Sequence, residues 1–153
     1  MAMKNIFKTN NDWAGLLLRL TIAIVIFPHG AQKFLGWFGG YGFTGTMNFF
    51  TTSVGLPWII GFLVILIEFF GSILLVLGLG SRIIAACMIA LAVGIIFTSH
   101  IQNGFFMNWF GNQKGEGYEY FLLLSGLSAA LVLNGSGKLS LDKIVFQTKK
   151  AGL

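Results

Sequence analysis

The chain has 153 residues, of which 56% are hydrophobic and only 10% are charged, and its mean hydropathy is +0.81. A soluble domain of this size has too little interior to bury so much apolar surface, so the composition predicts one membrane-embedded domain covering residues 1–153. The net charge of +5 comes mainly from Lys and Arg at the chain ends, beside apolar runs. This placement excludes nucleic-acid binding and predicts contact with membrane lipids.

The first two apolar runs predict helices at about residues 13–34 and 56–79. The first resembles a signal peptide, but Arg19 interrupts it and no small-x-small cleavage site follows, so we expect a retained crossing. The second begins with a proline, which is harmless in a first helical turn, and ends at glycines beside Arg82. Only Glu68 interrupts it.

Two further runs predict helices at about 83–101 and 118–133. The last is short for a crossing, which takes about 20 residues. The predicted fold class is therefore all-α, an integral membrane four-helix bundle. With four crossings, seven Lys and Arg residues fall on one side and two on the other, which predicts that both termini are cytoplasmic. The basic tail, residues 138–153, is expected to lie on the anionic membrane surface.

The predicted outer loop, residues 35–55, mixes aromatic residues with glycines, and a shorter outer segment at 104–111 repeats the pattern. Aromatic rings prefer the membrane interface, so these loops either anchor the bundle as an aromatic belt or dip back and cap a ligand. Trp37 and Trp109 are the candidates for stacking on such a ligand.

Arg19 and Glu68 are the two charges expected inside the bilayer. A charge near the bilayer centre costs about 3 kcal/mol, so two of opposite sign are expected to form an intramembrane pair. In the alternative interpretation, Arg19 extends to the cytoplasmic headgroups and Glu68 is protonated.

A second polar group is expected at the outer edge, where three predicted helices begin or end. His29, His100 and Glu119 should lie at one depth there, with Lys33 one turn beyond His29. Their spacing contains no HxxxH or ExxH pair, so we expect no metal site. Imidazoles at this position are suited to proton relay or to hydrogen bonding with a quinone oxygen, although each histidine taken singly is more often a hydrogen-bonded helix cap.

The sequence also resembles the DoxX family of bacterial membrane proteins over about residues 12–145. The resemblance rests on Arg19-Leu20, on the block His29-Gly30-Ala31-Gln32-Lys33 with the Phe34 to Gly40 segment, on Glu68 with Gly71, on His100 with Gly104-Phe105-Phe106, and on the closing Asn134 to Asp142 segment. In the closing segment, Ser136 stands where the family pattern has proline.

The resemblance implies a multi-pass protein of the bacterial cell (inner) membrane that is linked to quinone or thiol redox systems. The family's polar positions fall on Arg19, His29, Lys33, Glu68, His100 and Glu119. The chain has no flavin or nucleotide fingerprint and no CxxC pair, so any electron transfer would need a bound quinone or a partner. We expect no covalent cofactor and either a homo-oligomer or a redox-enzyme partner subunit. A proton-coupled transporter and a non-catalytic assembly protein remain alternatives.

Overall fold

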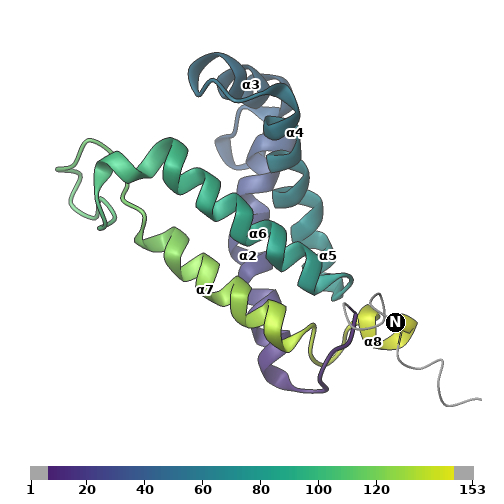
Figure 1. Ribbon diagram of the computed structural model, residues 1–153. Helices are drawn as coiled ribbons and strands as arrows, with labels where there is room; N and C mark the ends of the chain where they lie inside the picture. Colours follow the sequence, from purple (N-terminus) through teal and green to yellow (C-terminus); the bar gives the residue numbers. More distant parts are fainter. Residues whose placement is uncertain (1–6, 147–153) are drawn as a thin grey trace, which may run out of the picture.

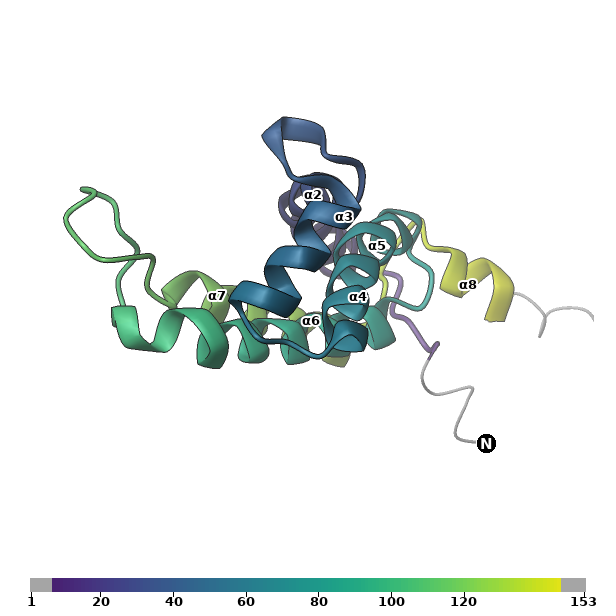
Figure 2. The same ribbon diagram turned by 90° about the horizontal axis from the view of Figure 1, so that it is seen from above.

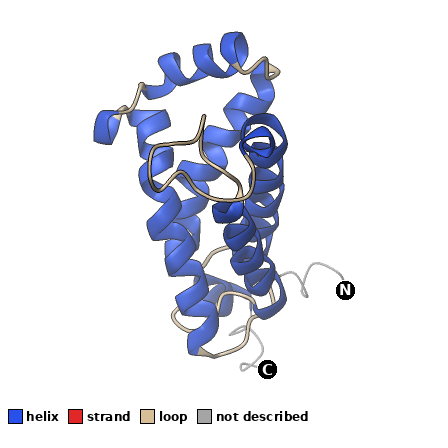
Figure 3. Cartoon of the chain, turned by 90° about the vertical axis from the view of Figure 1, so that its left-hand side faces the viewer, coloured by secondary structure: helices blue, strands red, loops and turns tan. Residues whose placement is uncertain are grey.

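The computed structural model describes residues 7–146, which form helices and connecting loops with no strand among them (Figures 1 and 3). The all-α prediction is confirmed. The long helices are α2 (Trp13–Leu35), α6 (Ser81–Ile95) and α7 (Glu119–Asn134). The shorter elements are η1 (Trp37–Gly39), α3 (Gly42–Asn48), η2 (Phe49–Ser53), α4 (Trp58–Leu66), η3 (Ile67–Gly71), α5 (Ser72–Leu77), η4 (Ile96–His100), η5 (Ile101–Asn103) and α8 (Leu141–Phe146).

Three helical segments are long and apolar enough to cross a membrane: Trp13–Leu35, Trp58–Leu77 and Ser81–Asn103. The fourth apolar helix, Glu119–Asn134, has 16 residues. At 1.5 Å per residue it is about 24 Å long, against about 30 Å of hydrocarbon. That this helix crosses the membrane, and hence that the chain has four crossings, stays a prediction. Because three of its helical segments are long and apolar enough to cross, the chain is a multi-pass membrane protein.

The helices form two groups that diverge from one end of the molecule. In Figure 1, α6 and α7 run side by side, while α4, η3 and α5 lie against α2. The two groups meet in a core around Ile22, Met88 and Leu131, which are buried. Residues 35–55, predicted as a loop, instead contain three short helices, η1, α3 and η2, which lie at the upper end of the α2 and α4 group in Figure 1.

The opposite end is closed by the segment that follows α7. The carboxylate of Asp142 accepts hydrogen bonds from the backbone N–H of Gly80 at 2.8 Å and of Ser81 at 3.3 Å, so it caps the start of α6. This contact holds α8 beside α5, as Figure 2 shows from above. The Phe7 ring stacks on Phe146 with centroids 4.1 Å apart.

Both described chain ends therefore lie on one side of the bundle, as an even number of crossings requires. Which side is cytoplasmic stays a prediction. Two of the four lysines of the basic tail, Lys149 and Lys150, lie outside the described residues. The expected contact of the tail with lipid stays a prediction.

Close packing between α2 and η3 depends on Gly30. A Cβ atom at this position would lie 2.5 Å from the backbone N of Phe69, which is far inside van der Waals contact. We expect Gly30→Ala to force the helices apart and to lower the free energy of unfolding by about 1–3 kcal/mol. Gly94→Ala is the matched control, because a Cβ there meets no atom within 4 Å. Thermal unfolding of both variants in detergent measures the difference, and equal stability would contradict the packing role.

Candidate ligand cavity

A cavity of about 260 Å³ lies between the two helix groups, at the end where they diverge. Its walls come from α2, α4, η3, α6, η4 and α7, and residues 49–56 roof it. The lining is mostly apolar, with a few polar groups: His29, Lys33, Glu68, Thr98, Ser99, His100 and Tyr120 among Ile26, Phe49, Phe50, Val54, Leu56, Val64, Leu91, Ile95, Phe121 and Leu124. A largely apolar pocket with a few convergent polar groups is typical of small-molecule sites.

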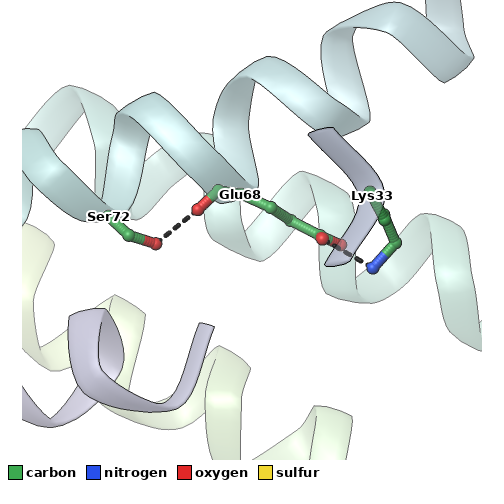
Figure 4. A network of polar contacts seen from close by, with 3 residues as sticks. All are labelled: Lys33, Glu68 and Ser72. Atoms are coloured by element: carbon green, nitrogen blue, oxygen red, sulfur yellow. Dashed lines mark hydrogen bonds and ion pairs between the residues drawn. The ribbon is translucent and has the colours of Figure 1, made fainter. Parts of the chain in front are cut away.

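Lys33 and Glu68 form an ion pair inside this cavity, with 2.6 Å between Lys33 Nζ and Glu68 Oε2 (Figure 4). The Glu68 side chain is only 5% exposed and the Lys33 side chain 25%. Ser72 donates to the backbone carbonyl of Glu68, four residues earlier in the chain. The pair fixes α2 against η3 and places one buried carboxylate at the cavity wall.

The predicted Arg19–Glu68 pair is wrong, because Glu68 pairs with Lys33 and Arg19 binds backbone carbonyls near the end of α5 and after α7. Arg19 as a whole is 1% exposed, and its guanidinium donates five hydrogen bonds, all to backbone carbonyls. The acceptors are Leu75 and Val76 at the end of α5, and Ser136, Lys138 and Leu139 in the segment after α7. The free carbonyls of a helix end attract a cation, and here they take the place of the carboxylate.

The predicted outer ring is formed in part. His29, Lys33 and His100 all line the cavity, so their expected convergence is seen in the structure. His29 makes no hydrogen bond with the described residues. Glu119 and Trp109 are not part of the lining; instead, the Glu119 carboxylate accepts from the Trp109 indole N–H at 3.3 Å.

Glu119 therefore orders the loop between α6 and α7. Its carboxylate also accepts the backbone N–H of Met107 at 2.9 Å. Trp37 lies outside the cavity too, with 54% of its surface exposed. The ligand-stacking role expected for Trp37 and Trp109 has no support in this geometry. Exposed rings at these positions match the aromatic-belt interpretation.

His100 is held by the same loop. Its Nδ1 lies 2.7 Å from the carbonyl oxygen of Glu116, and its ring packs against Phe121 with centroids 4.7 Å apart. A carbonyl oxygen can only accept, so Nδ1 carries the hydrogen in this bond. In a neutral imidazole Nε2 is then left as an acceptor, with no partner among the described residues.

The roof and Tyr120 were not identified from the sequence as cavity residues. Phe49 and Phe50 line the cavity, so part of the aromatic segment caps it, as the second interpretation of that segment required. Both rings also border a second hollow of about 240 Å³, which shares Lys33 with the first. The signal for Tyr120 was its helical spacing, because it precedes buried Leu124 by four residues and so lies on the same helix face.

Three stretches of π-helix border the cavity, and each supplies residues to its wall. They are η2 with Phe49 and Phe50, η3 with Glu68, and η4 with His100. A π-helical turn holds an extra residue and shifts the faces of the helix that follows, and such turns occur frequently at functional sites. Their gathering here supports a functional cavity, separate from the Arg19 end. The described residues contain no group of three or more His, Cys, Asp or Glu side chains placed to hold a metal ion.

Comparison with known proteins agrees with this architecture. The family model described as DoxX matches residues 14–101. A Bacillus subtilis (strain 168) protein named "Putative oxidoreductase CatD" is 36% identical over 137 residues, which is 90% of each chain. No solved structure matches the chain. The matched segment contains Arg19, His29, Lys33, Glu68 and His100, and it covers more than half of the sequence. The chain belongs to the DoxX family.

Proposed function

We propose that this protein is an accessory, quinone-interacting subunit of a redox system in the bacterial cell (inner) membrane, and that its cavity holds the quinone head group. The observation that carries the proposal is the cavity itself, where a few polar side chains, Lys33, Glu68, His29 and His100 among them, face a mostly apolar space. The oxidoreductase name of the Bacillus relative supports a redox role.

The size and chemistry of the cavity suit one aromatic ring. An engineered cavity of about 150 Å³ binds benzene, so about 260 Å³ has room for a ring with oxygen substituents. Phe49, Phe50 and Phe121 supply apolar surface for such a ring. The ammonium of Lys33 and the ring of His29 offer hydrogen bonds to its oxygens.

In this proposal the bound quinone carries out the redox chemistry and exchanges electrons with a partner protein. A quinone is the redox group, while the side chains of this protein bind and orient it. Electrons would pass to or from a partner subunit or a second copy of the chain. Catalysis by the chain alone is not part of the proposal.

The transporter alternative loses its main support, because it required Arg19 and Glu68 to share one site. They have different partners: Arg19 binds backbone carbonyls, and Glu68 binds Lys33. If no ligand binds, the alternative of a non-catalytic assembly protein is favoured.

The test is equilibrium binding of decylubiquinone to the purified protein in lipid nanodiscs. We expect saturable binding that Val64→Phe weakens about tenfold or more, because the larger ring occupies the cavity. Val93→Phe is the matched control, since Val93 is 42% exposed and lies outside the cavity. Absent binding, or equal binding by both variants, would contradict the proposal.

A further inference from the structure

The hydroxyl of Tyr120 is buried at the cavity and has no hydrogen-bond partner among the described residues. A buried donor without an acceptor is costly, and phenylalanine at the same position would avoid that cost. The group gains a partner only if something in the cavity supplies an acceptor. The hydroxyl is thus an available donor for a ligand oxygen.

His100 offers the complementary group. Its Nδ1 is committed to the Glu116 carbonyl at 2.7 Å, which leaves Nε2 as an acceptor in the neutral ring. Lys33 binds Oε2 of Glu68, and Oε1 of the same carboxylate accepts no hydrogen bond from residues 7–146. The cavity wall therefore carries acceptors as well as donors.

We infer that the ligand is a hydroxylated aromatic ring, a hydroquinone in preference to the corresponding quinone, with its oxygen accepting from the Tyr120 hydroxyl and a hydroxyl donating to His100 Nε2. This inference rests on the proposed function and specifies the redox form that the cavity binds. A quinone carbonyl accepts but does not donate, so it satisfies Tyr120 and leaves His100 Nε2 without a donor. A ring hydroxyl does both.

The test compares decylubiquinone, decylubiquinol and the dimethyl ether of decylubiquinol, all under anaerobic conditions in nanodiscs. The ether retains the oxygens but has lost its donors. One hydrogen bond changes an equilibrium constant by about threefold to tenfold, so we expect the hydroquinone to bind tighter than either other probe by that factor.

Two variants separate the two contacts. Tyr120→Phe removes only the hydroxyl, so we expect about threefold to tenfold weaker binding of all three probes, with unchanged or higher thermal stability. A residue with a merely structural role would lose stability. His100→Asn keeps a donor for the Glu116 carbonyl and removes Nε2, so it is expected to abolish the preference for the hydroquinone. Tyr118→Phe, outside the cavity, is the matched control and should change neither.

The outcomes distinguish this inference from the proposed function. If the quinone binds as tightly as the hydroquinone, or if His100→Asn keeps the preference, the inference fails while a quinone site remains. If Tyr120→Phe leaves binding of all three probes unchanged, its hydroxyl is not a ligand donor and the inference also fails. If none of the probes binds, both proposals fail.

Discussion

Replacing Arg19 with methionine is expected to leave little folded protein. All five N–H groups of the guanidinium donate to backbone carbonyls, and the side chain is 1% exposed. Leu75 also accepts the N–H of Gly78, at 3.1 Å. The bonds to Ser136 and Leu75 are buried and the other three are partly buried. A buried carbonyl that loses its donor costs about 1–3 kcal/mol and a partly buried one less, so the expected loss is about 4 kcal/mol. A typical domain has a stability of only about 5–15 kcal/mol.

The loss should depend on geometry as well as on charge. Arg19→Lys keeps the positive charge, but an ammonium has three donors, so at least two carbonyls lose their hydrogen bonds and the variant should be intermediate in stability. Arg82→Met is the control at the same end, because Arg82 donates to only two carbonyls, those of Lys8 and Val132. We expect it to cost much less.

The measurement is the fraction of protein that remains monodisperse in detergent after heating, followed by size-exclusion chromatography. A stable Arg19→Met variant would show that the carbonyls at this end find other partners. From the most to the least stable, the expected order is wild type, Arg82→Met, Arg19→Lys, then Arg19→Met.

The helix positions were predictable because hydropathy alone determines them. The predicted ranges 56–79 and 83–101 correspond to observed segments at Trp58–Leu77 and Ser81–Asn103. Depth in the membrane was predictable too, since it follows from position along a helix. This is why His29, Lys33 and His100 were expected together, and they do line one cavity.

The rotation of each helix about its axis could not be predicted from depth. Successive residues on an α-helix point about 100° apart, so Glu119 and Tyr120 have almost the same depth but face different directions. Glu119 faces the loop, and Tyr120 faces the cavity. Hydropathy does not distinguish these two orientations.

The partner of Arg19 was missed for another reason. The prediction considered only side chains as partners, whereas the available acceptors are backbone carbonyls at the end of α5 and in the closing segment. That segment folds back over the helix ends, with Asp142 capping α6. Arg19 and Ser136 are 117 positions apart in the sequence, and no local sequence pattern indicates their contact.

Breaking the Lys33–Glu68 pair is expected to have unequal effects from its two sides. Lys33→Met leaves a carboxylate that is only 5% exposed, so its charge has no nearby compensation and the loss should approach the ~3–5 kcal/mol typical of a broken buried pair. Glu68→Gln leaves an ammonium on a side chain that is 25% exposed, and this long chain can extend toward the interface, so the loss should be smaller.

The double variant Lys33→Met with Glu68→Met tests whether the ion pair stabilises the fold or serves only ligand binding. Two apolar side chains leave no uncompensated charge, so we expect it to recover most of the stability that Lys33→Met loses. Thermal unfolding in the same detergent gives the interaction free energy as a double-mutant cycle. If Glu68→Gln proves more damaging than Lys33→Met, the carboxylate must hold more than Lys33 in place. If all variants are equally stable, the pair adds nothing to the fold, and its burial at the cavity would be explained by ligand binding alone.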